Sequence, residues 1–196
     1  MTVRLKSLAL VILLAACTGG CVHRQLIALD DYQPIMRGVG DPDVAVALLV
    51  EDGRTLPAGD DAADIGVMHE SFGETTEFEL SDPAAIRYLV RAATKNALRL
   101  ARINVSPQAP RTLVVTIRKF WVAVPSREAH IIVGLVLQDR QGATLWSGSA
   151  VGGAGGWIWA DFPQSMLRGV YQRSLANYAE TASRAFASAE FQRQIY

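Results

Sequence analysis

Residues 129–138 read Ala-His-Ile-Ile-Val-Gly-Leu-Val-Leu-Gln, and Asp139-Arg140-Gln141-Gly142 and the stretch 143–151 follow. The run 129–138 is apolar at both odd and even positions, which is typical of a strand covered on both faces. Gly142 is placed to adopt a positive φ in a tight turn. We therefore predict a central strand over 129–138 that forms an antiparallel hairpin with 143–151.

Further strands are expected on the N-terminal side of this hairpin. Side chains alternate from Leu113 to Arg118, and Phe120 to Val124 continue the same strand, so the meander spans 111–151. Upstream, the Val- and Leu-rich run 44–50 predicts a buried strand that ends at Glu51-Asp52-Gly53-Arg54. Residues 65–69 and 75–80 are weaker strand candidates.

Two stretches have the apolar spacing of amphipathic helices. Ser81-Asp82-Pro83 is a good helix start, because Asp82 can accept hydrogen bonds from free amide groups and Pro83 suits a first turn. Apolar residues then recur at helical spacing over about 83–103, and again over about 163–191. The expected fold class is α+β, with an antiparallel sheet covered on one face by these two helices.

The N-terminus has the pattern of an export signal. Arg4 and Lys6 precede the apolar run 8–16, and Leu14-Ala15-Ala16-Cys17 matches the lipobox of bacterial lipoproteins. As a helix, the run would cross only about half of the ~30 Å hydrocarbon core, which argues against a membrane span. We expect residues 1–16 to be a signal peptide that is removed, and Cys17 to carry the lipid anchor.

The anchor predicts where the protein resides. Thr18 follows Cys17 in place of the Asp that favours retention in the inner membrane, so we expect the outer membrane, on its periplasmic side. Cys21 would then be the one remaining thiol, either free or paired between molecules. Residues 17–43 have the mixed composition of a membrane-proximal linker, and 44–196 are expected to form a single domain.

Composition excludes several functional classes. Half of the chain is hydrophobic and 19% is charged, which is enough apolar material for a real core. After loss of Arg4 and Lys6, the mature chain has 17 basic and 19 acidic residues, or about −2, which argues against nucleic-acid binding. The three histidines lack metal-ligand spacing, and no nucleophile elbow is present. We expect no catalytic residues, no metal and no cofactor.

Charge is unevenly distributed along the chain. Residues 41–82 contain twelve acids and one base, Arg54, whereas the charged residues of 83–103 are all basic. Such opposed blocks are expected to face each other or to occupy opposite poles of the fold. The bases lie three or four positions apart, on one side of the expected helix, and are candidates for contact with an anionic ligand: Arg87, Arg91, Lys95, Arg99 and Arg102. A solvated helix face is the alternative explanation of this stripe.

A glycine run and an aromatic cluster follow the hairpin. Residues 152–156 read Gly-Gly-Ala-Gly-Gly, but no Gly-Lys-Ser or Gly-Lys-Thr follows, so a phosphate loop is not indicated. The cluster consists of Trp157, Trp159 and Phe162. One interpretation is contact with a partner or with the membrane interface, and the alternative is that these rings cap one end of the core.

The chain resembles the YajG-like family of small bacterial lipoproteins over about residues 44–190. Asp52-x-Arg54 and Ile65-Gly66 match the family pattern best, together with the lipobox, the helix and the hairpin from Leu113 to Val151. The segment from Gly152 to Trp159 has no counterpart in that family. The resemblance implies an α+β envelope lipoprotein without an established reaction, and it therefore supplies no active site.

Two functional interpretations remain open. In the first, the protein is a non-enzymatic lipoprotein that docks an envelope protein partner. In the second, it is a lipid- or glycolipid-handling accessory, similar to the auxiliary lipoproteins of envelope transport systems. An open groove between helices and sheet would favour lipid handling, whereas a close-packed core with an exposed aromatic patch would favour docking.

Overall fold

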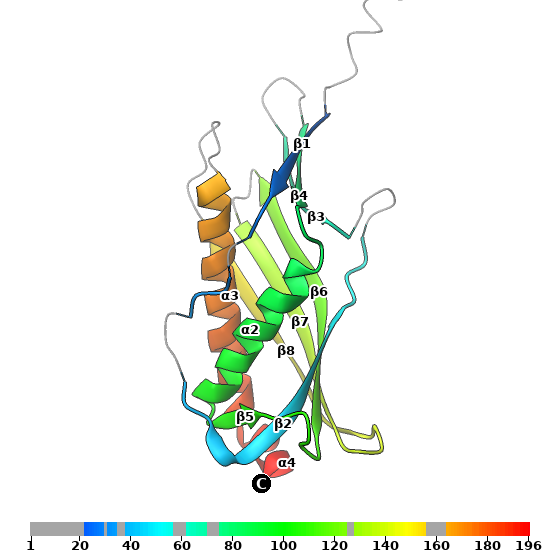
Figure 1. Ribbon diagram of the computed structural model, residues 1–196, viewed down its shortest axis with the longest axis vertical. Coiled ribbons are helices and arrows are strands. Elements are labelled where there is room, and N and C mark those ends of the chain that lie inside the picture. Colours follow the sequence, from blue (N-terminus) through cyan, green and yellow to red (C-terminus); the bar gives the residue numbers. More distant parts are fainter. Residues whose placement is uncertain are drawn as a thin grey trace, which may run out of the picture.

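The computed structural model describes residues 22–29, 31–34, 38–56, 62–69, 75–124, 128–155 and 164–196 (Figure 1). The predicted signal peptide, Cys17, Cys21 and the aromatic cluster Trp157, Trp159 and Phe162 lie outside the described residues. No helix in the described part of the chain is both long and apolar enough to cross a membrane.

The predicted hairpin is present. Strand β7 (Glu128–Gln138) pairs antiparallel with β8 (Thr144–Gly155) along its whole length. Gly142 has a φ of 84°, and the Asp139 carboxylate accepts hydrogen bonds from the Gln141 and Ala143 amides, both at 2.9 Å. The turn chemistry that the sequence predicts is therefore confirmed.

Strand β6 (Thr112–Val124) organises the rest of the sheet. One edge pairs antiparallel with β7, and the other is shared by two parallel strands in succession. Strand β2 (Asp41–Asp52) pairs with residues 112–117 of β6, and β3 (Asp64–His69) pairs with 122–124. Residues 118–121 of β6 consequently have no paired strand on that side among the described residues.

Three shorter strands complete the sheet. Strand β4 (Thr75–Leu80) is antiparallel to β3, β1 (Val22–Ile27) is parallel to β4, and β5 (Ile103–Val105) is parallel to β2. The predicted antiparallel meander is therefore wrong for this half of the molecule, because the sheet is mixed. Alternating side chains reveal a strand but not its direction, and the crossover through the helix between β2 and β6 makes that pair parallel.

Helices α2 (Ala85–Leu100) and α3 (Gln164–Phe186) cover the same face of the sheet, as predicted (Figure 1). The expected helix over 163–191 is instead divided, because Ser188 is extended and a separate helix, α4 (Ala189–Ile195), follows. The Ser188 hydroxyl accepts a hydrogen bond from the Phe191 amide at 3.3 Å, so it caps the new helix.

Part of the segment predicted to be a linker belongs to the fold. Strand β1 lies within 17–43 and pairs with β4, and Tyr32 is only 9% exposed. The Gln172 side chain of α3 bonds to the Gln33 amide at 3.1 Å and to the Asp31 carbonyl at 2.9 Å. The folded unit therefore begins before Val44, because residues with little periodicity are held by backbone pairing and by contacts with α3.

The interior between helices and sheet is closely packed. Phe120 and Tyr171 stack with ring centroids 4.9 Å apart, and both are almost fully buried. The Thr94 hydroxyl donates to the Val90 carbonyl and accepts from Tyr178, each at 2.7 Å, which joins α2 to α3. A side chain at Gly152 would lie 2.1 Å from the Ser174 carbonyl oxygen, so this glycine allows α3 to approach β8 closely.

Candidate functional site

The second face of the sheet has no covering layer among the described residues. On β7, Val133, Leu135 and Leu137 are fully buried beneath the helices, whereas Ile132 and Val136 face the other way and are partly exposed. The sequence of β7 predicts burial on both faces, but the described chain buries only one. We call the uncovered side the open face.

Apolar side chains on the open face form rows across the strands. Leu49, Val114 and Val136 are neighbours in register on β2, β6 and β7. A second row contains Ile132 and Val151, which are paired on β7 and β8. Leu49 is 45% exposed and Val151 is 47% exposed, so both rows present hydrophobic surface to solvent.

A β-bulge places two cations on the open face, one within the second row and one between the two rows. The β6–β7 register shifts between Ile117 and Lys119, so Arg118 has no partner of its own on β7. Successive residues of a regular strand point to opposite faces, but this extra residue leaves both Arg118 and Lys119 exposed. Neither cation forms an ion pair with a described residue.

Gly134 determines where the Arg118 side chain can lie. A Cβ atom at Gly134 would be 2.9 Å from Arg118 Nε and 3.0 Å from its Nη2. The guanidinium group therefore rests on the backbone of β7, in the space that a side chain at position 134 would occupy. The missing side chain positions a positive charge against the open face.

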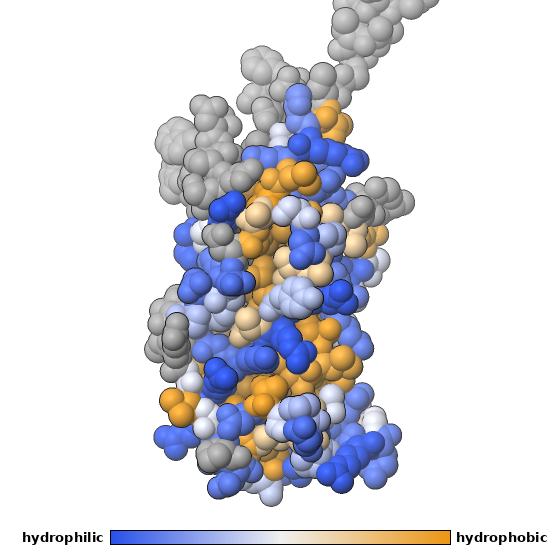
Figure 2. Space-filling model, in the orientation of Figure 1, coloured by the Kyte–Doolittle hydropathy of each residue, from blue (hydrophilic) through white to orange (hydrophobic). Residues whose placement is uncertain are grey.

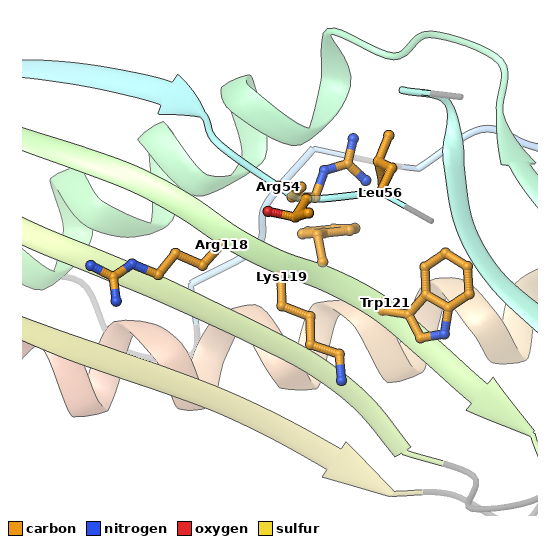
Figure 3. Close-up of a pocket in the computed structure, with 7 residues that line it drawn as sticks. Arg54, Leu56, Arg118, Lys119 and Trp121 are labelled. Atoms are coloured by element: carbon orange, nitrogen blue, oxygen red, sulfur yellow. The ribbon is translucent and has the colours of Figure 1, made fainter. Parts of the chain in front are cut away.

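A pocket of about 360 Å³ opens beside the bulge (Figure 3). It lies where β6 is left unpaired between β2 and β3, and its lining combines cations with apolar groups: Arg54, Thr55, Leu56, Arg118, Lys119, Phe120 and Trp121. In Figure 3, Arg118 and Lys119 leave β6 in different directions, and Trp121 lies farther along the strand. The two cations thus extend beyond the pocket, across the open face.

Arg54 has a structural part in this pocket. Its guanidinium contacts the Asp52 carboxylate at 2.9 Å and donates to the carbonyls of Ala62 at 2.6 Å and Asp64 at 3.0 Å. The side chain is only 3% exposed. Arg54 therefore joins the end of β2 to the start of β3 across the gap, and the Asp52-x-Arg54 motif is accounted for by this contact.

The predicted basic stripe lies along α2 and the turn that follows it. The Arg91 guanidinium donates to the Leu48 carbonyl at 3.0 Å, so this member of the stripe is bound to β2. Arg87, Arg99 and Arg102 are exposed. Lys95 and Arg99 line a cavity of about 460 Å³ together with Tyr32 and Asn96. The structure therefore does not present the five residues as one free cationic surface.

The ion pairs described for the acidic segment involve bases outside this stripe. Asp52 pairs with Arg54, and Glu77 and Glu79 pair with Arg24 of β1 at 3.2 Å. The expectation that the two charge blocks face each other is not met by any described ion pair. The acids of β4 lie beside β1, which the sequence assigned to the linker, and this placement explains the difference.

The described residues contain no group of three or more potential metal ligands. In the glycine run, Gly152 packs against α3, and the Gly153 carbonyl accepts a hydrogen bond from Asn177 at 2.5 Å. Sequence reasoning missed Arg118 and Lys119 as site residues. The available signal was a pair of adjacent cations within an otherwise alternating strand.

No family model matches this sequence, and no curated protein matches it. Among solved structures, it is similar to a Xanthomonas campestris protein of family-model DUF330, with 13% identity and a TM-score of 0.55 over 87% of this chain and 98% of that one. A second structure, of an uncharacterized protein, has 13% identity and a TM-score of 0.52 over 83% and 99% of the two chains. A lipoprotein from Neisseria meningitidis aligns with 15% identity and a TM-score of 0.33 over 67% and 99%.

The first two similarities show a shared fold. They support the broader part of the expected resemblance, an α+β domain of a kind already seen in bacteria. Membership of the YajG-like family stays a prediction.

Proposed function

We propose that this protein is a lipid-anchored, non-enzymatic lipoprotein of the cell envelope that binds a partner protein through the open face of its sheet. One observation carries the proposal: the sheet has apolar rows on both sides, and only one side is covered by described elements. A sheet face with exposed apolar side chains is stabilised when another layer covers it.

The packing of the interior supports docking over lipid storage. The side chains between the sheet and the helices form one continuous buried cluster, which includes Phe78, Phe120, Tyr178 and Phe186. The described cavities are surface pockets, and the one between α2 and the ends of β1 and β4 does not extend through the cluster that α3 packs against. The described chain thus offers no wide internal groove for acyl chains, which favours the first of the two functional interpretations.

The anchor and the fold together define an orientation. Cys17 precedes Val22, the first residue of β1, by five residues, which span at most about 18 Å when extended. Strand β1 begins at the end of the molecule opposite the C-terminus (Figure 1). We infer that the β1 end faces the outer membrane, and that the open face stands roughly upright beside it.

The same end carries the boundaries of the aromatic segment. Gly155 ends β8 and Gln164 begins α3, both near the β1 end of the molecule (Figure 1). Trp157, Trp159 and Phe162 fall between these residues in the sequence. Contact of this aromatic segment with the membrane interface or with a partner is part of the proposal.

Cross-linking of the lipidated protein in its native envelope tests the proposal, followed by mass spectrometry of captured protein and lipid. One recurrent protein partner is expected. Phospholipid or glycolipid without a protein partner would overturn the docking function and support lipid handling.

The alternative, lipid or glycolipid handling, has one observation in its favour. A pocket of about 310 Å³ lies between the ends of β1 and β4 and helix α2, and its apolar lining includes Ile27, Leu29, Leu80 and Leu89. Figure 2 shows hydrophobic side chains in the upper half of this helical side of the molecule and further ones in its lower half. The exposed bases of α2 lie on the same helix and would face lipid phosphates.

Replacement of Lys95 and Arg99 by Gln tests this alternative. If the basic stripe binds lipid headgroups, the double variant should bind vesicles containing anionic phospholipid several-fold more weakly, because each base near the surface contributes about 1 kcal/mol. Replacement of Arg140, an exposed base in the hairpin turn, is the control. Unchanged vesicle binding would assign the stripe to a solvated helix face.

A further inference from the structure

The open face has the chemistry of a docking surface for one particular kind of segment. We propose that it binds an amphipathic helix of an envelope protein partner, and that carboxylates on that helix contact Arg118 and Lys119. This inference rests on the proposed docking function and specifies the partner's chemistry.

The charge on this surface indicates which residues the partner must carry. Lys119 is the register partner of Ile132 in the second row, and Arg118 lies between that row and the row of Leu49, Val114 and Val136. Neither cation forms a described ion pair. Burying two unpaired cations under an apolar layer would be costly, so a purely hydrophobic partner does not fit. Asp or Glu side chains of the partner would pair with both cations, while the apolar residues that flank them would cover both rows.

The dimensions of the surface suit a helix. The rows cross strands β2, β6, β7 and β8, which are three interstrand spacings or roughly 14 Å wide. One helix with its side chains is about 10–12 Å across. A single helix laid over the centre of this surface would convert the two-layer domain into a three-layer one, in which both faces of the sheet are covered by helices.

The bulge and Gly134 explain how this surface would select a partner that carries carboxylates. Without the register shift, the alternation of Leu113, Val115 and Ile117 would leave Arg118 on the open face but turn Lys119 toward the helical side. Gly134 then leaves room for the Arg118 guanidinium to lie flat against β7. The structure thus holds a planar donor at the surface, where it can form paired hydrogen bonds with a carboxylate.

The test uses the full-length, lipidated protein in its native envelope. A photo-reactive side chain is placed at Val151 on the open face or at Tyr88, which is 67% exposed on α2, as the positional control. Illumination at Val151 is expected to yield an adduct with a protein segment that carries Asp or Glu among apolar residues spaced three and four apart. Cross-linking from Tyr88 should not capture that segment.

Charge variants then connect the adduct to the two cations. Arg118→Glu with Lys119→Glu should lower the adduct yield at least about tenfold, whereas Arg140→Glu should not change it. A charge swap, with the captured acids replaced by Lys, should restore the adduct to the double variant. Gly134→Ala displaces only the end of the Arg118 side chain, so it should reduce the yield while leaving the melting temperature nearly unchanged.

Four outcomes would overturn the inference. An adduct at Val151 with lipid or with a second copy of this chain would assign the open face to another occupant. A protein adduct that survives charge reversal would remove the role of Arg118 and Lys119. Protein capture from Tyr88 but not from Val151 would refute this surface and leave the docking function standing, whereas no protein adduct from any exposed position would contradict both.

Discussion

Arg54 holds together the interrupted edge of the sheet. Strands β2 and β3 both pair with β6 but not with each other, so no described strand pairing connects their ends. The Arg54 guanidinium supplies that connection through Asp52 and the carbonyls of Ala62 and Asp64. A charged side chain therefore connects two strands here, as backbone hydrogen bonds do elsewhere in the sheet.

Arg54→Ala should lower the free energy of unfolding by about 2 kcal/mol, because the Asp52 carboxylate, which is 24% exposed, and two carbonyls would lose a donor that is itself almost fully buried. Arg184→Ala is the matched control: its ion pair with Glu180 is exposed, and its loss should cost no more than about 0.5 kcal/mol. Urea unfolding of both variants measures the difference. Equal, small losses would show that Arg54 contributes no more than a surface ion pair.

Buried Tyr178 makes the stability of the fold depend on pH in the alkaline range. Burial raises the pKa of Tyr178, and that of Tyr171 too, above the ordinary value of 10.0, so these phenols stay protonated in the folded state. Above pH 10 the unfolded chain releases protons that the folded chain keeps, and stability must fall as the pH rises. Tyr178→Phe should cost about 1 kcal/mol near neutral pH through loss of its hydrogen bond to Thr94.

Because Tyr178→Phe also removes one of these groups, the stability curves of the variant and the wild type should converge as the pH rises above 10. Urea unfolding between pH 7 and pH 11 would show this. A constant difference between the two proteins over that range would mean that the buried phenol has no part in alkaline destabilisation.

The position of α3 on β8 depends on one glycine of the run 152–156. A methyl group at Gly152 would collide with the backbone of α3, whereas at Gly153 the nearest atom would be 4.0 Å away. Gly152→Ala should therefore destabilise the fold by about 2 kcal/mol, and Gly153→Ala should change it little. Thermal unfolding of this adjacent pair separates close packing from glycine flexibility, since loss of flexibility would affect both variants alike.

The break between α3 and α4 also depends on side-chain packing. Phe191 of α4 packs edge-on against Trp146 of β8, with ring centroids 4.8 Å apart, and also contacts Phe186. One straight helix through Ser188 would not direct Phe191 back to β8. The helical periodicity of 163–191 continues across the break, so the sequence pattern alone does not show it.

At the scale of the whole molecule, the proposed anchoring and orientation depend on Cys17. Cys17→Ser should abolish lipid attachment and leave the precursor uncleaved, because the thiol carries the diacylglyceryl group before signal removal. Incorporation of labelled fatty acid and the mass of the mature protein measure both steps. Cys21→Ser is the matched control and should be processed normally. Normal processing of Cys17→Ser would move the anchor to Cys21 or remove it.

Much of the element list could be predicted from residue order. Local chemistry determines the hairpin of β7 and β8, the turn at Gly142 and the approximate extents of α2 and β6, because turn residues and apolar periodicity act over a few neighbours. The same reasoning predicts that both helices cover one face, since each has an apolar stripe to bury.

Strand direction, the place of β1 and the candidate site were decided by tertiary structure. Parallel pairing of β2 and β3 with β6 depends on contacts about 60 residues apart, for which alternation contains no signal. Strand β1 is held by β4 and by Arg24 with Glu77 and Glu79, not by its own pattern. Arg118 and Lys119 share a face only because of a bulge.

The sequence by itself determined the predicted export signal, the strand and helix propensities and the apolar excess of β7, since each depends on residues that are close along the chain. Only the tertiary structure decided which face of β7 is left open and which cations stand on it. The physical reason is that burial is a property of the assembled layers: β7 is apolar on both sides, and the described chain supplies helices for one.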